Sequence, residues 1–339
     1  MTTTIDIPTD KPATGTASRR AFNWKRETER FALVGAWLLL VVVFGILMPD
    51  SFLSWRNFST MFGSQAVLVM LTLALIVPLT SGDFDLSGAS ILTMSSMLIA
   101  VLNVREGMPI VPVIAIALFA GAVIGAVNAF FVLYFRIHSL IVTLGIGTFV
   151  NGMVLWLSAS QTISGVSMDL VSWVIINRFL GIPLAFFYAL MLAAAIWYVL
   201  EFTIPGRKLL FVGRGREVSR LNGIDVDRVR AVSFVVSGVI AALAGVMYAG
   251  MTGSADPLSG LSLLLPAFAA AFLGATTISP GRFNAFGAVI AVYFLVTGIT
   301  GLTMMGADAY VQNLFYGGAL VVAVALSQLV RNRQPQDFS

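Results

Sequence analysis

The sequence predicts an all-α integral membrane protein with about ten transmembrane helices, some of them broken or short. Of its 339 residues, 58% are hydrophobic and 11% are charged, and the mean hydropathy is +0.93. Soluble domains carry about 25% charged residues, so one water-soluble core cannot hide this apolar surface. The chain has no cysteine, which excludes disulfides, thiolate catalysis and cysteine-bound metal sites.

The first 30 residues are polar and basic and contain no apolar stretch followed by a small-residue cleavage site. We therefore expect residues 1–30 to form a cytoplasmic tail rather than a cleaved signal peptide. The run from Phe31 to Met48 is apolar and ends at Pro49. It is long enough to cross a hydrocarbon core of roughly 30 Å, so we expect it to be the first span.

The same length and composition criterion predicts nine further spans and a transmembrane domain over 31–330, followed by a cytoplasmic tail at 331–339. The nine spans are 58–80, 85–102, 110–134, 139–159, 182–202, 231–252, 263–278, 283–302 and 310–330. Two of them are irregular in sequence. The segment 139–159 is rich in Gly and Thr, and the short segment 263–278 contains Pro266.

The distribution of basic residues predicts that both ends of the chain are cytoplasmic. In that orientation 17 of the 20 Lys and Arg residues lie on the inner side, and only Arg56, Arg105 and Arg178 lie outside. The inverse orientation would violate the positive-inside rule. This asymmetry also explains the net charge of +4 without nucleic-acid binding.

No Asp, Glu, Lys, Arg or His falls in the middle of a predicted span. Proton-coupled carriers need ionisable groups at membrane depth, and an intramembrane enzyme needs a nucleophile and base, or a metal site. We therefore expect no catalytic residue, no metal site and no cofactor. Asp83 and Asp85 lie at the end of a span and form a weak acid/base pair, and we interpret His138 as an interfacial residue.

The polar residues that remain inside the spans are small or neutral. Such groups can bind an uncharged hydroxylated solute, or they can join helices by hydrogen bonds. The candidates for a substrate path are Gln65, Asp85, Ser87, Asn128, Thr143, Asn151 and Thr276. Two of these, Asp85 and Ser87, belong to the turn described next. The chain contains no Gly-rich Walker sequence, so ATP hydrolysis would require a separate subunit.

A turn at 80–90 carries the first family-like pattern. Pro78 and Gly82 break one helix, and Asp85 or Ser87 can accept the free amide hydrogens at the start of the next. The segment 82–89, Gly-Asp-Phe-Asp-Leu-Ser-Gly-Ala, resembles the Gly-Ile-Asp-Leu-Ser-Val-Gly signature of sugar-type permeases of bacterial ABC importers. These permeases form the ribose, xylose and autoinducer-2 branch of the branched-chain transport permease family. The sequence departs from the signature with Phe84 in place of Ile and with Gly-Ala in place of Val-Gly.

The basic loop 203–230 is the most specific segment. Residues 217–222 fit a short amphipathic helix with Val218 and Leu221 on one side, and Gly223 suits a left-handed C-terminal cap. The loop resembles the family's coupling region, whose short helix docks into a groove on a cytoplasmic ATPase. The resemblance implies that Glu217, Val218, Leu221 and Gly223 couple the chain to that ATPase. The alternative is a basic loop bound to anionic lipid headgroups.

A third segment, 235–281, contains small residues and a helix break that also resemble the family. The pair Gly121 and Gly125 is typical of close helix packing. The pattern Phe-Asp-x-x-Gly-Ala at 84–89 also returns weakly as Phe-Asn-x-x-Gly-Ala at 283–288, as in the internal repeats of many transporters. Both copies follow a predicted helix break.

Together these resemblances imply a permease subunit of an ABC importer in the bacterial inner membrane. Its solute would be a small polyhydroxylated molecule, and its partners would be ATP-binding subunits, a solute-binding protein, a second permease subunit in a homodimer or heterodimer, and membrane lipid. Three alternatives remain: a facilitative channel or uniporter, an intramembrane enzyme, and an ABC permease for nucleosides or branched-chain amino acids. A zwitterion can be held by helix ends without buried charges.

Overall fold

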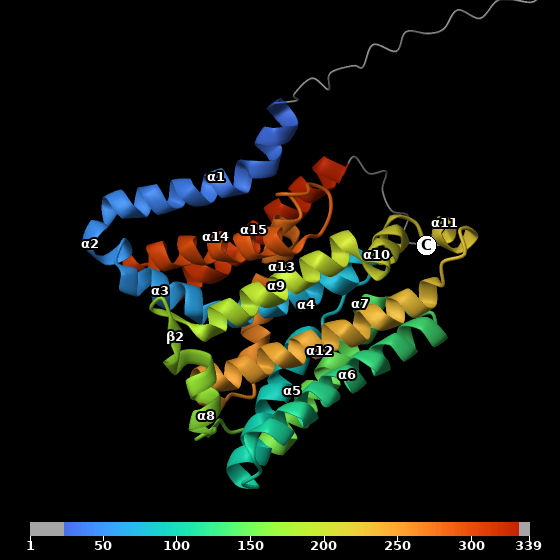
Figure 1. Cartoon of the computed structure of the whole chain (residues 1–339), viewed down its shortest axis with the longest axis horizontal. Helices are drawn as coiled ribbons and strands as arrows, with labels where there is room; N and C mark the ends of the chain where they lie inside the picture. The colour runs from blue at the N-terminus through green and yellow to red at the C-terminus, as the bar shows by residue number, and fades with distance from the viewer. Residues whose placement is uncertain (1–23, 332–339) are drawn as a thin grey trace, which may run out of the picture.

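The computed structural model describes residues 24–331, and within that range the chain is almost entirely helical (Figure 1). The helices are α1 (Trp24–Leu47), α2 (Pro49–Phe52), α3 (Trp55–Ser64), α4 (Ala66–Thr80), α5 (Gly88–Ala100), α6 (Ile110–Tyr134), α7 (Ser139–Ser158), α8 (Met168–Val171), α9 (Leu184–Phe202), α10 (Ile204–Arg214), α11 (Arg216–Leu221), α12 (Val226–Thr252), α13 (Ser259–Gly274), α14 (Ala285–Met304) and α15 (Ala309–Arg331). Two π-helical turns, η1 (Val101–Arg105) and η2 (Ser172–Ile176), extend α5 and α8.

Four two-residue strands form two small antiparallel pairs. Strand β1 (Ile163–Ser164) pairs with β4 (Ser254–Ala255), and β2 (Arg178–Phe179) pairs with β3 (Ile182–Pro183). Both pairs lie in segments that connect long helices. The fold class is therefore helical, as the composition predicts.

Seven helical segments of the described chain are long and apolar enough to cross a membrane. Three shorter apolar helices, within α1, α13 and α15, complete a set that corresponds one to one with the ten predicted spans. The irregular segment 139–159 is the continuous helix α7. The N-terminal tail up to residue 23 and the C-terminal tail from residue 332 lie outside the described residues.

Several helices begin or end at residues other than the bounds of the predicted spans, and caps and turns explain the differences. The span predicted at 58–80 is two helices, α3 and α4, which meet at Gln65. The span predicted from 231 begins at Val226, because the Asp225 side chain accepts a hydrogen bond from the Arg228 N–H at 3.0 Å and caps α12. The span predicted at 263–278 is α13, which contains Pro266 and ends four residues earlier.

The loop 203–230 contains two short helices ahead of α12 rather than the one predicted. The expected short helix is α11, and it is preceded by α10, which the sequence analysis missed. The Thr203 side chain accepts a hydrogen bond from the Gly206 N–H and so caps α10, and Pro205 occupies its first turn. Both are ordinary helix-start signals.

The centre of the molecule is formed by α12, which packs against α4, α5 and α6. Gly121 and Gly125 of α6 lie against backbone atoms of Gly238 and Phe234 in α12, where a Cβ atom would have no room. Such contact allows the two helix axes to approach closely. The predicted packing role of this glycine pair is therefore confirmed.

The connections predicted to be cytoplasmic meet at one end of the helices. Arg216 of the loop 203–230 contacts Asp83 of the turn at 81–84, and Arg136 of the turn at 135–138 contacts Asp227. In Figure 1, α10 and α11 lie at this end, and α8 and β2 lie at the opposite end.

The connections predicted to lie outside meet one another as well. The Arg105 guanidinium donates hydrogen bonds to the carbonyl oxygens of Leu157 and Ser158, and the Asn103 side chain accepts one from the Ser167 N–H. Strand β1 lies between α7 and α9, and β4 lies between α12 and α13. Their pairing joins these two connections at the same end. The connections named here therefore form two separate clusters within the described residues.

Candidate functional site

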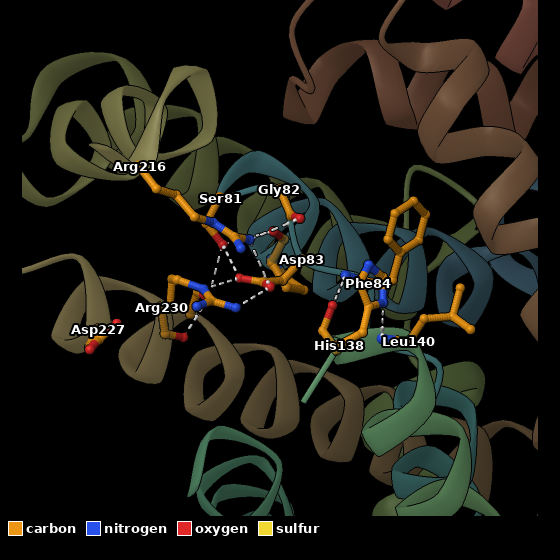
Figure 2. Close-up of polar contacts among 12 residues, drawn as sticks. Ser81, Gly82, Asp83, Phe84, His138, Leu140, Arg216, Asp227 and Arg230 are labelled. Atoms are coloured by element: carbon orange, nitrogen blue, oxygen red, sulfur yellow. Dashed lines mark hydrogen bonds and ion pairs between the residues drawn. The ribbon is translucent and has the colours of Figure 1, made fainter. Parts of the chain in front are cut away.

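Three polar contacts hold the turn between α4 and α5 against one face of α12. The Oγ atoms of Ser81 and Ser233 are 3.4 Å apart, and the Ser237 hydroxyl donates to Asp85 Oδ2 at 2.8 Å. Arg230, one turn before Ser233 on α12, binds Asp83 (Figure 2). Positions 230, 233 and 237 share a face of α12 because they are three and four residues apart.

Asp83 is the centre of this contact. Arg230 donates from Nε to Asp83 Oδ2 at 2.7 Å and from Nη2 to Oδ1 at 2.6 Å, which is a two-pronged ion pair. Arg216 of α11 adds Nη2 contacts to Oδ1 at 3.0 Å and to the Gly82 carbonyl oxygen at 3.2 Å. The side chain of Asp83 is 1% exposed, that of Arg230 is 8% exposed and that of Arg216 is 41% exposed.

This geometry joins three separate segments of the chain through one carboxylate. Paired guanidinium–carboxylate bonds are strong and directional. Removing one partner of a buried ion pair leaves an uncompensated charge and typically costs about 3 to 5 kcal/mol. The Asp83 carboxylate therefore links α11, the turn at 81–84 and α12.

Sequence reasoning missed this network. The sequence alone indicates only a weak acid/base role for Asp83, and Arg230 stands in it as one of seven basic residues of the loop 203–230. The available signal was the spacing of Arg230, Ser233 and Ser237, which places polar side chains on one face of an otherwise apolar helix. Their partners lie about 150 positions away in sequence, so spacing alone could not name them.

Asp85, Ser87 and Asn128, all predicted path residues, form a second buried network. Asp85 accepts a hydrogen bond from the Ser87 N–H at 3.1 Å, just before α5 begins at Gly88. The Ser87 hydroxyl does not cap the helix but donates to Asp85 Oδ1 at 2.6 Å. The Asn128 amide in turn donates to Ser87 Oγ at 2.7 Å.

Thr143 fastens α7 to the same turn. Its hydroxyl oxygen accepts a hydrogen bond from the Leu86 N–H at 3.0 Å, and the hydroxyl lies within donating distance of the Phe84 and Ser139 carbonyl oxygens. Asp85, Ser87, Asn128 and Thr143 are all fully buried. The structure therefore brings four of the seven predicted path residues together around one turn.

The remaining three lie elsewhere. Gln65 lines a cavity of about 480 Å³ between α4, α14 and α15, whose other polar lining residues include Thr300, Gln312 and Tyr316. Asn151 is half-buried on α7. Thr276 follows α13, where its hydroxyl donates to the Leu273 carbonyl oxygen at 2.7 Å.

Helix α11 presents its apolar residues to the surroundings. The exposed fraction is 63% for Val218 and 87% for Leu221, and Glu217 is also exposed. Gly223 has φ of +76°, as predicted for a left-handed cap. Such a conformation strains a residue that has a Cβ atom.

The predicted interfacial residue His138 lies just before α7. Its Nδ1 atom accepts a hydrogen bond from the Leu140 N–H at 3.3 Å, so it caps that helix. Neighbouring Arg136 forms a two-pronged ion pair with Asp227, which Arg220 of α11 also contacts at 3.2 Å. The turn at 135–138 is therefore tied to the loop that carries α11.

Comparison with known proteins identifies a family for this chain. Residues 57–324 match the family model described as branched-chain amino acid transport system, permease component. The ribose import permease protein RbsC of Escherichia coli K12 is 30% identical over 321 residues, which cover 94% of this chain and 98% of RbsC.

Two further relatives are similar over most of the chain. The D-allose transport system permease protein AlsC of Escherichia coli K12 is 28% identical over 93% of this chain and 96% of its own. The autoinducer 2 import system permease protein LsrD of Salmonella paratyphi A is 28% identical over 89% and 92%, respectively. Because the family model covers residues 57–324 and RbsC is 30% identical over 94% of this chain, the chain belongs to the branched-chain amino acid transport permease family.

Proposed function

We propose that this chain is the membrane subunit of an ATP-driven ABC importer in a bacterial inner membrane. The observation that carries the proposal is α11, a short helix with two exposed apolar side chains that is linked through Arg216 to the transmembrane helices. Exposed apolar residues held on a rigid element are typical of a docking surface. The relatives named above are all permeases of import or transport systems.

The topology that we propose has ten spans with both termini in the cytoplasm. Its support is the 17-to-3 distribution of basic residues and the separate clustering of the two loop sets at opposite ends of the helices. In this orientation α10 and α11 face the cytoplasm. An ATPase subunit would then meet α11 directly, and a solute-binding protein would deliver its ligand at the opposite end.

Coupling follows from the contacts of α11. ATP-driven movement of the partner would displace Val218 and Leu221, and the rigid link from Arg216 to Asp83 would pass that movement to α4, α5 and α12. The chain itself would carry out no covalent chemistry. Two copies, or this chain with a related subunit, would enclose the path.

We propose a small polyhydroxylated solute, a sugar or polyol, on chemical grounds and on the names of the relatives. The cavity beside Gln65 carries amide and hydroxyl groups and one aromatic ring, with no charged side chain in its lining. Amides and hydroxyls pair with solute hydroxyls, and a neutral lining suits an uncharged ligand. Three relatives are named for ribose, allose and arabinose.

The seven path residues remain a proposal with two different roles. Gln65 lines a cavity and is the best placed to contact a solute. Asp85, Ser87, Asn128 and Thr143 are buried and bonded to one another, and we propose that they position the turn beside the path. For Asn151 and Thr276 we retain the path assignment from sequence alone.

The experiment is reconstitution of the permease with its ATPase and solute-binding subunits in proteoliposomes, with uptake and ATP hydrolysis measured together. Replacing Val218 and Leu221 with Asp alters only exposed side chains, so the protein should insert and accumulate normally. Gly223→Val is a second test of the same loop. Uptake and binding-protein-stimulated ATPase activity should both fall strongly, and the ATPase should co-purify less well.

Arg228→Gln, an exposed change in the same loop but outside α11, is the matched control and should retain activity. Full uptake and ATPase activity in the α11 variants would contradict the coupling role. Downhill flux without ATPase subunits would indicate a channel or uniporter. A substrate panel of pentoses, hexoses, nucleosides and leucine decides the solute class, and preference for leucine or a nucleoside would overturn the sugar assignment.

A further inference from the structure

A small basic cavity of about 280 Å³ lies where α9, α10 and the loop between α13 and α14 meet. Its charged lining residues are Glu201, Arg207, Arg214 and Arg282, and its other lining residues are apolar. Arg207 and Arg214 are seven residues apart, so they share one face of α10. Arg282 comes from a segment about 70 positions further along the chain.

The charges of this cavity are not balanced. Glu201 accepts a hydrogen bond from Arg282 Nη2 at 3.3 Å, and these two side chains are about one third exposed. Within the described residues, Arg207 and Arg214 form no ion pair, and the buried Nε atom of Arg282 has no hydrogen-bond partner. Three guanidinium groups therefore line a cavity that holds one carboxylate.

We propose that this cavity binds a phosphate group. Guanidinium groups match phosphate geometry with paired N–H···O bonds and remain charged at all physiological pH values. The volume is just below the roughly 300 Å³ at which pockets for larger ligands begin, so it suits a phosphate monoester or diester head. The group can come from an inner-leaflet phospholipid or from a soluble phosphate ester.

The position of the site gives it a regulatory consequence. Arg207 and Arg214 lie on α10, and α10 leads directly into α11. A phosphate that bridges α10 to Arg282 would hold the loop 203–230 against the end of α13. Binding would therefore change the rate of ATP-driven uptake.

The test uses the purified full-length permease and two probes. Inorganic phosphate is titrated against a chloride control of equal ionic strength, with thermal unfolding as the readout. In the lipid arm, nanodiscs of phosphatidylglycerol or phosphatidylcholine are compared, and native mass spectrometry counts the retained lipid. The variants are Arg207→Gln with Arg214→Gln, the single Arg282→Lys, and the control Arg228→Gln, which is exposed in the same loop but outside this cavity.

The double variant should lose at least tenfold in affinity for the probe that binds, and Arg228→Gln should not. Glu201→Gln removes the competing carboxylate and should tighten binding severalfold, a gain that a merely structural role would not produce. Binding of phosphate alone assigns the site to a soluble ester, and selective retention of phosphatidylglycerol assigns it to a lipid headgroup. Equal binding by wild type and the double variant in both arms would overturn the proposal.

Discussion

Gly213 packs directly against the carbonyl oxygen of Thr80, with no space for a Cβ atom between them. Gly206, two turns earlier on α10, meets the backbone of Val199 and Leu200 in α9 in the same way. Helix α10 is therefore wedged between α9 and the start of the turn at 81–84. This contact and the Arg216–Asp83 ion pair form two independent links from the loop 203–230 to the transmembrane helices.

The substitution Gly213→Ala should separate α10 from Thr80. The added Cβ atom must push rigid backbone rather than a flexible side chain, so we expect a destabilisation of about 1 to 3 kcal/mol and a loss of coupled uptake. The measurement is thermal unfolding in detergent together with uptake in proteoliposomes. Gly145→Ala is the control, because nothing lies within 4 Å of its Cβ position on helix α7. Equal effects of the two changes would refute the wedge.

The Asp83 ion pair should show different sensitivities at its two arginines. Arg230→Met leaves a buried carboxylate with one partner, and we expect a loss of about 3 kcal/mol, the lower end for a broken buried pair. Arg216 is partly exposed, and solvent screens its charge, so Arg216→Met should cost about 1 kcal/mol or less.

The double variant Asp83→Leu with Arg230→Met provides the control for this asymmetry. It removes both buried charges and should recover part of the stability that Arg230→Met loses. Uptake should stay impaired, because Arg216 then has no carboxylate to hold. A double variant no more stable than Arg230→Met would show that packing, rather than charge, accounts for the loss.

The helical fold could be predicted from sequence because its signals are local. Apolar runs and Pro and Gly breaks identified seven segments that are long apolar helices in the structure and three that are shorter apolar helices, and the boundaries of α6 coincide with the prediction. Two of the differences between prediction and structure lie at helix N-caps. Asp225 starts α12 early, and Thr203 starts a helix where a loop was expected.

The candidate site could be predicted only in part. Val218, Leu221 and Gly223 follow from the amphipathic pattern and turn chemistry of a few adjacent residues, and their exposure and φ angle agree with it. The Asp83–Arg230 pair depends on two helices distant in sequence. No periodicity within either helix specifies such a contact, so it required the fold.

Substitutions at Asp85 should separate hydrogen bonding from charge. Its carboxylate accepts hydrogen bonds from the Ser87 N–H, the Ser87 hydroxyl and the Ser237 hydroxyl. Asp85→Asn keeps an acceptor, whereas Asp85→Leu leaves buried donors unpaired at about 1 to 3 kcal/mol each. Uptake at matched expression should therefore be much higher for Asn than for Leu. Equal loss in both variants would indicate that the negative charge itself is needed, and equal activity would remove Asp85 from the site.

The proposed topology predicts which positions can be labelled from each side of the membrane. Single cysteines can be placed without background because the chain has none. Cysteines at the exposed positions Arg207 and Glu217 should react with a membrane-impermeant maleimide only in inside-out vesicles, and those at Glu106 and Asp169 only in right-side-out vesicles. The reasoning is that the first pair belongs to the loop cluster around Asp83 and the second pair to the opposite cluster around Arg105. The expected labelling pattern at all four positions would place α11 on the cytoplasmic side of the membrane, where ATP is available. Labelling of a cysteine at Glu217 from outside would contradict the proposed orientation, because a cytoplasmic ATPase could then not reach α11.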